Sequence, residues 1–197
     1  MKSNAAQLLR YAASMSATDG ARGPEVADDE PPWLTEQERA AWVETSSLVL
    51  QLPGLLDAQL RRDADLGLFD YLVMSWLSMA PDRQARMGEL AQLAQGSLSR
   101  LSNVVKRLEQ RGFMQREPDP TNGRYTLALL TEAGWAKVVE AAPGHVRAVR
   151  RYIFDPLTPQ QVPALLEVAA PIADGIRKAA NGDQPDAPVE NDCDPPA

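Results

Sequence analysis

The feature that most limits the possible folds is a change of hydrophobic period past the middle of the chain. Residues 97–113 (SLSRLSNVVKRLEQRGF) carry apolar side chains at helical spacing. Residues 113–117 and 124–130 instead contain the β-branched and aromatic side chains that are typical of strands. Between them, Asn122-Gly123 is a strong hairpin signal. The sequence therefore predicts a helix that leads directly into a β-hairpin.

A second short helix is predicted just before this one, over residues 87–94 (MGELAQLA). Residues 95–97 form a tight turn between the two, in which Gly96 supplies unusual backbone angles. A short helix, a turn with glycine and a basic second helix make a helix-turn-helix. The basic hairpin that follows makes it a winged version.

The rest of the chain is predicted to be helical. Thr35 and Glu38 form a capping-box signature ahead of the first helix. Thr131 caps a long helix that Pro143-Gly144 should bend or break, and Thr158 caps the last helix. We therefore expect a mainly α fold with a small β-hairpin wing.

The two ends of the chain differ in composition from its middle. Residues 1–32 are expected to be a flexible arm, and residues 181–197, with five acidic and no basic side chains, a disordered acidic tail. The net charge of −7 belongs to these ends, because residues 33–180 are neutral. Within that neutral region, residues 83–124 hold eight basic side chains against four acidic ones. Such a basic patch decides the choice of partner more than the global charge does.

Several functional classes are disfavoured. The single cysteine, Cys193, excludes an intramolecular disulfide and points to a reducing compartment, so we expect a cytoplasmic protein. With one cysteine and one histidine, a zinc site is not expected. No apolar run reaches the roughly 18 residues of a membrane span. No nucleophile-base pair or phosphate-binding glycine loop points to an enzyme or a cofactor.

The helix over residues 97–113 has two faces on a helical wheel. The side chains expected to pack inward are Leu98, Leu101, Val104, Val105 and Leu108. The side chains expected to meet DNA are Ser97, Ser99, Arg100, Ser102, Asn103, Lys106 and Arg107. Short polar groups and an arginine near the start of a recognition helix read base edges, and bases further along reach phosphates. The alternative is an ordinary solvated amphipathic helix, and the neighbouring turn and wing favour the DNA-binding interpretation.

Residues Met87 to Gly134 resemble the MarR family of winged-helix transcriptional regulators. The resemblance rests on a helix ending in Leu-Ala, then RLE, RG with an apolar residue, the wing entrance PDP, and LT-x-x-G. It implies a winged helix over about residues 68–131 between dimerisation helices at about 35–62 and 132–180. It also implies a homodimer that binds a pseudo-palindromic operator in double-stranded DNA as a ligand-responsive repressor. The apolar runs VETSSLVLQL and PALLEVAAPIADGI agree with a dimer, although they could instead cap their own domain.

The wing departs from the family pattern. Family wings commonly carry an Asp-Arg-Arg-like tip whose arginine enters the minor groove. Here Asn122 replaces the second acid and Gly123 stands where the first arginine is expected. Asn122 and Arg124 are the remaining candidates for DNA contact. For Arg124 we favour a structural pairing with Asp119 that closes the hairpin over the DNA contact, and the two roles can coexist.

The resemblance also implies a pocket for a small, often phenolic or lipophilic, effector. Its candidate lining residues are Trp42, Phe69, Tyr71 and Trp76, with plain core packing as the alternative. His145 is either a ligand or pH-sensing residue or, as we favour, a packing histidine. A different functional class remains open: a winged helix that has lost DNA binding and contacts proteins. A steep salt dependence of binding would distinguish DNA from protein partners.

Overall fold

The computed structural model describes residues 33–93 and 98–180 and divides into two compact units, one ending at Leu52 and one beginning at Pro53. The predictions for the arm at residues 1–32, the turn at 95–97 and the tail at 181–197 fall outside the described residues. Helix α2 (Glu36–Ala64) contributes its first half to the N-terminal unit and its second half to the C-terminal unit.

The start of α2 carries the predicted capping box. The backbone N–H of Thr35 donates to Glu38 Oε2 at 2.7 Å, and the Glu38 N–H donates to Thr35 Oγ1 at 3.3 Å. These bonds satisfy amide donors that have no partner within the helix. Four large apolar side chains beyond this cap in the N-terminal unit are more than 60% exposed: Trp42, Leu48, Val49 and Leu50.

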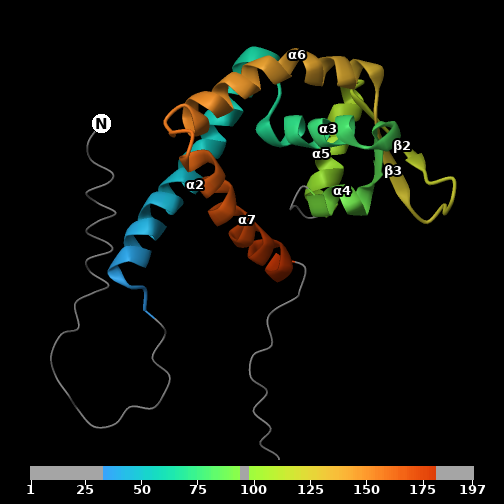
Figure 1. Ribbon diagram of the computed structural model, residues 1–197. Helices are drawn as coiled ribbons and strands as arrows, with labels where there is room; N and C mark the ends of the chain where they lie inside the picture. The colour runs from blue at the N-terminus through green and yellow to red at the C-terminus, as the bar shows by residue number, and fades with distance from the viewer. Residues whose placement is uncertain (1–32, 94–97, 181–197) are drawn as a thin grey trace, which may run out of the picture. The chain divides into compact units, whose positions relative to one another are not determined.

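The C-terminal unit contains the predicted helix-turn-helix and wing. Its helices are α3 (Leu68–Met79), α4 (Met87–Leu93), α5 (Leu98–Gln110), α6 (Glu132–Val149) and α7 (Gln161–Ala180). A 3-10 helix spans Pro81–Arg83, and a π-helical turn spans Arg150–Phe154. Figure 1 shows α6 running along α3. Among the described helices, none combines the length and apolarity needed to cross a bilayer.

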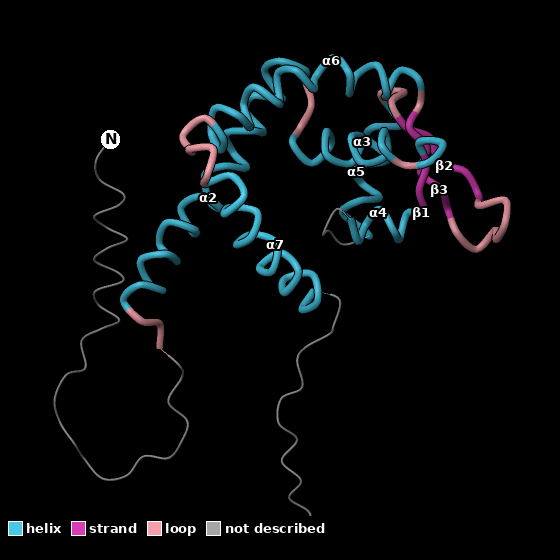
Figure 2. Tube along the Cα trace, viewed as in Figure 1, coloured by secondary structure: helices cyan, strands magenta, loops and turns pink. Residues whose placement is uncertain are grey.

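Three antiparallel strands form the wing sheet: β1 (Gln84–Arg86), β2 (Met114–Pro118) and β3 (Thr126–Leu130). Their order is β1-β3-β2, so β3 lies in the centre (Figure 2). The sequence predicted β2 and β3 as a hairpin, whereas β1 was not expected. The expected fold class, mainly α with a small β-wing, is confirmed, with a sheet of three strands rather than two.

The core of this unit is formed by α3, α4, α5 and the sheet, together with residues of the second half of α2 and of α6. Leu101, Val104, Val105 and Leu108 are at most 5% exposed, as predicted for the inner face of α5. The prediction for Leu98 was wrong, because this side chain is 56% exposed. Leu98 is the first residue of α5, a turn ahead of the first side chain that reaches the core.

The end of α5 is closed by a tight C-terminal cap. Gly112 has φ +74°, a left-handed conformation that glycine adopts without strain. Its N–H donates to the Glu109 carbonyl and the Phe113 N–H donates to the Leu108 carbonyl, each at 2.9 Å. This pair of bonds is the Schellman motif, which satisfies carbonyls left over at a helix end. It fixes the direction in which the chain leaves α5 and enters β2.

The start of α6 is fastened to this cap. Thr131 is the predicted N-cap: its Oγ1 accepts from the Gly134 N–H at 3.0 Å and donates to the Gly112 carbonyl at 2.7 Å. The sequence predicted a bend or a break at Pro143-Gly144, and the structure shows no break there. Helix α6 continues through Pro143 to Val149, where the π-helical turn begins.

Candidate DNA-binding surface

The outer face of α5 presents the polar residues that the sequence assigned to DNA. Ser99, Arg100, Asn103, Lys106 and Arg107 are exposed, and Ser102 is half-buried. Ser97 lies outside the described residues. Because the core-facing residues of the same helix are buried, α5 is fixed to the unit by one side and presents the other.

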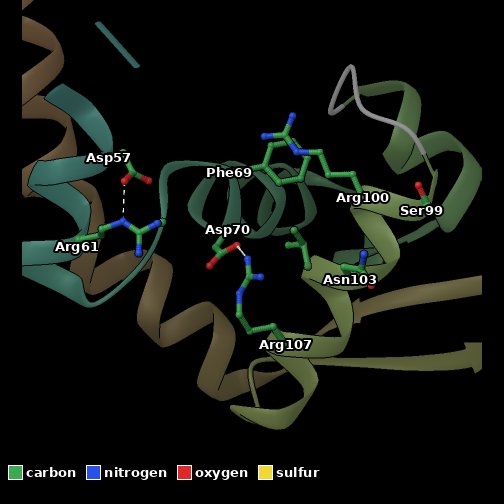
Figure 3. A pocket seen from close by; sticks show the side chains of 10 residues that line it. Asp57, Arg61, Phe69, Asp70, Ser99, Arg100, Asn103 and Arg107 are labelled. Atoms are coloured by element: carbon green, nitrogen blue, oxygen red, sulfur yellow. Dashed lines mark hydrogen bonds and ion pairs between the residues drawn. The ribbon is translucent and has the colours of Figure 1, made fainter. Parts of the chain in front are cut away.

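Two arginines of this face point toward α3, as Figure 3 shows. The guanidinium of Arg100 lies over the Phe69 ring, 4.4 Å from its centroid. Arg107 Nη2 donates to Oδ1 of Asp70, a carboxylate that is only 8% exposed. Two of the exposed basic residues of α5 therefore also contact α3.

The wing is held by a buried carboxylate at its base. Asp119 is 5% exposed, and its Oδ1 accepts from the Thr121 hydroxyl at 2.6 Å and from the Thr121 N–H at 2.8 Å. Its Oδ2 accepts from Arg86 Nε at 2.8 Å. The Thr121 bonds above all, and then Arg86, lower the pKa of Asp119 to about 2. The carboxylate is therefore charged at any physiological pH.

The predicted pairing of Asp119 with Arg124 was wrong. Arg86 of β1 occupies that role, and its guanidinium also lies 4.6 Å from the centroid of the Tyr125 ring. Arg124 is exposed, and its backbone N–H donates to Asn122 Oδ1 at 3.2 Å. The side chain of Arg124 is thus not used to close the hairpin, which leaves the DNA role that the sequence analysis gave as its alternative.

Sequence reasoning missed Arg86 because β1, at three residues, is too short to show a strand period. One signal was present in the sequence. A carboxylate that follows a strand and enters a tight turn requires a cation or several donors if the turn packs against the sheet. Arg83 and Arg86 were the nearest unassigned cations upstream of the helix-turn-helix.

A cavity of about 700 Å³ lies beside α5, lined by residues of α2, α3 and α5 within the C-terminal unit. Its wall includes Phe69 and the ionisable residues Asp57, Arg61, Asp70, Arg100 and Arg107. Asp57 Oδ1 accepts from the Leu68 N–H at 2.8 Å, so a side chain of α2 caps α3. This bond, followed by that from Arg61, lowers the pKa of Asp57.

The four predicted effector-binding residues do not gather at this cavity. Phe69 lines it, whereas Tyr71 is buried in the core with its ring 4.6 Å from that of His145. Trp76 is half-buried and packs against the core, and Trp42 belongs to the N-terminal unit. The cavity is therefore richer in charged groups than the aromatic pattern suggested.

His145 packs in the way the sequence analysis favoured. The ring is half-buried against Tyr71, and this burial lowers the pKa of His145. Within residues 33–93 and 98–180, no three His, Cys, Asp or Glu side chains gather closely enough to hold a metal ion.

Comparisons with known proteins agree with this geometry. The profile of the MarR family matches residues 70–126. The crystal structure of Sco3205 in complex with DNA, a MarR family transcriptional regulator from Streptomyces coelicolor, is 41% identical, with a TM-score of 0.71. That similarity covers 75% of this chain and 92% of Sco3205.

Two further relatives are AbsC and YdcH. AbsC, another MarR family transcriptional regulator from Streptomyces coelicolor, is 33% identical over 74% of this chain and 97% of AbsC, with a TM-score of 0.70. YdcH, an uncharacterised HTH-type transcriptional regulator of Bacillus subtilis, is 40% identical over 55 residues, which are 28% of this chain and 37% of YdcH. The match thus spans little more than a third of that curated relative. Since Sco3205 and AbsC are matched over nearly their whole length, the chain belongs to the MarR family of winged helix-turn-helix transcriptional regulators.

Proposed function

We propose that the protein is a cytoplasmic, sequence-specific DNA-binding repressor that acts as a homodimer on a pseudo-palindromic operator and responds to a small molecule. The observation that carries the proposal is the exposed polar face of α5 in a winged helix-turn-helix whose 41% identical relative was crystallised with DNA. This face combines short polar groups near the helix start with bases further along, which suits base edges and phosphates respectively.

The contacts divide by position on α5 and the wing. Ser99, Arg100 and Asn103 stand in the first two turns and are assigned to base edges. Lys106, a turn further along, is assigned to a phosphate. The predicted contacts of Ser97, Ser102 and Asn122 belong to the same proposal. Arg124, exposed on the wing and not paired with Asp119, is assigned to the DNA backbone or minor groove.

Selection of bound sites from random DNA, followed by titration at several salt concentrations, tests this assignment. Arg100→Ala should reduce discrimination between the selected site and its single-base variants. Lys106→Ala should weaken binding to all of them and reduce the salt slope by about 0.9, the value of one lost phosphate contact. Unchanged affinity and slope in both variants would show that α5 does not meet DNA.

The homodimer is supported by α7, which has no buried residue. Leu166, Val168 and Ile176 are 69%, 61% and 56% exposed, so the apolar side chains of this helix are not buried within a single chain. A soluble protein rarely leaves such a helix bare, and a two-fold partner covers it symmetrically. Sedimentation equilibrium should give a dimer for the wild type and a monomer for Leu166→Glu. A wild-type monomer at micromolar concentration contradicts the proposal.

The response to a small molecule is supported by the cavity beside α5. Three arginines against two aspartates, together with Phe69, favour a ligand with an aromatic ring and an anionic group. Benzoate and its neutral analogue benzamide are suitable probes. Benzoate should bind by calorimetry and weaken the DNA complex, and benzamide should do neither. If benzoate and benzamide behaved alike, the proposed preference of the cavity for an anionic group would be wrong.

A protein-interaction module is the second candidate. It is favoured by the engagement of Arg100 and Arg107 with α3 and by Gly123 at the tip of the wing. A selected DNA pool with no enrichment, or binding without salt dependence, would support this candidate over the repressor.

A further inference from the structure

The ion pair between Arg107 and Asp70 joins the end of the recognition helix to the start of α3. Asp70 lies in the first turn of α3, and its carboxylate is 8% exposed. A charged group removed from water in this way is stable only with a partner and hydrogen bonds. Arg107 Nη2 supplies that partner from a position 37 residues away along the chain. The pair is therefore a tertiary link rather than a local feature of α5.

Two other arginines of the same region reach the same short stretch of chain. Arg100, two turns before Arg107, stacks on Phe69. Arg111, one turn after it, donates to the Asp65 carbonyl at 2.8 Å and to Asp65 Oδ2 at 3.0 Å. Residues 65–70 thus contact three cations, Arg100 and Arg107 from α5 and Arg111 from just beyond its end. The hydrogen bonds of Arg107 and Arg111 attach the end of α5 to its own domain.

We propose that Arg107 is a positioning residue for DNA recognition: through Asp70 it sets the angle of α5 against α3, and it does not neutralise a DNA phosphate. This inference rests on the proposed function and departs from the phosphate contact that the sequence predicted for Arg107. If Arg107 turned to a phosphate, Asp70 would stay buried without its cation, which costs more than one solvated phosphate contact returns. Lys106, its neighbour in sequence, has the same charge and is exposed, so it is the matched control.

DNA binding of four variants separates the two roles: Arg107→Ala, Asp70→Asn, the double variant, and Lys106→Ala. If Arg107 positions the helix, Arg107→Ala and Asp70→Asn each weaken binding on the order of tenfold, and the double variant is no worse than either. The salt slope stays at the wild-type value in all three. Lys106→Ala instead lowers the slope by about 0.9. The proposal is overturned if Asp70→Asn binds as tightly as wild type or tighter, or if Arg107→Ala loses the same slope as Lys106→Ala.

Unfolding by urea, without DNA, measures the same link independently. The Asp70 and Arg107 variants should be coupled by about tenfold in the folding equilibrium constant, and Arg107→Lys should retain part of that coupling. Absence of coupling overturns the proposal even if a variant is too unstable for DNA titration. If the wild type binds no DNA but the coupling is present, the proposed function fails while the link between α5 and α3 stands.

Discussion

Replacing Gly134 by alanine should raise the helix propensity of α6 but disturb its packing, and we expect the loss in packing to be the larger effect on stability. In the first turn of α6, a Cβ on Gly134 would lie 2.1 Å from the Phe113 carbonyl oxygen and 2.7 Å from Leu130 Cδ1. The first of these is about 1.3 Å short of an ordinary contact, so the start of α6 must move away from the cap of α5. That movement weakens three hydrogen bonds, of the Thr131 N–H to Phe113, of Gly134 to Thr131 Oγ1, and of Thr131 Oγ1 to Gly112.

The magnitude follows from these bonds. At about 1 kcal/mol each, they amount to about 3 kcal/mol. Alanine returns about 1 kcal/mol through its higher helix propensity. The net loss is about 2 kcal/mol, within the range of about 1–3 kcal/mol known for overpacked sites. With a typical slope of about 2 kcal/mol per molar urea, the unfolding midpoint should fall by about 1 M.

Urea unfolding followed by circular dichroism, at one fixed protomer concentration, checks this value. Gly88→Ala is the matched control, because Gly88 also lies near a helix start and a Cβ there meets nothing within 4 Å. It should be neutral or stabilising by at most about 1 kcal/mol. If Gly134→Ala were as stable as Gly88→Ala, the close approach of α6 to Phe113 would not exist in solution and the reasoning would be refuted.

Three further predictions concern charge and packing. The pKa of Asp119 is lowered to about 2, so its carboxylate stabilises the fold above about pH 4. This contribution is lost as the pH falls from about 4 to 2. The difference in urea midpoint between wild type and Asp119→Asn should therefore shrink over that window. Burial lowers the pKa of His145, so stability should decrease as the pH falls below about 6.5, where the unfolded chain takes up the proton. His145→Gln should lack this decrease. Leu108→Ala removes a fully buried side chain from α5 and should cost about 3 kcal/mol in urea unfolding, whereas a loss below about 1 kcal/mol would show that α5 is loosely packed.

Much of the fold could be predicted because local signals and the final structure agree. The capping residues Thr35 and Thr131, the inner face of α5 and the two hairpin strands each depend on neighbours close in sequence. Of the bend or break expected at Pro143-Gly144, the break does not occur, because a proline that lacks one N–H can still be held within a helix packed along α3. The prediction for Leu98 was wrong because a helical wheel assigns a residue to a face of the helix but does not show where along the helix that face meets the core.

The site was harder to predict because its partners are distant in sequence. Arg86 reaches Asp119 across 33 residues and Arg107 reaches Asp70 across 37, and neither spacing leaves a periodic signal. The same basic residue types serve as contacts and as internal links, so composition alone assigns them all to DNA. Only the fold separates Lys106, which is proposed to contact DNA, from Arg107 and Arg86, which bind carboxylates of their own chain.

The bond between Arg86 and Asp119 has a consequence for building chimeric regulators. The wing hairpin, from β2 to β3, is a continuous segment that one could exchange between relatives to change specificity. However, Arg86, the cation that pairs with Asp119, lies outside this segment, on β1 ahead of α4 in the sequence. A transplant that omits β1 would deliver a hairpin whose buried carboxylate has lost its cation, so the smallest exchangeable piece includes residues 84–86 as well.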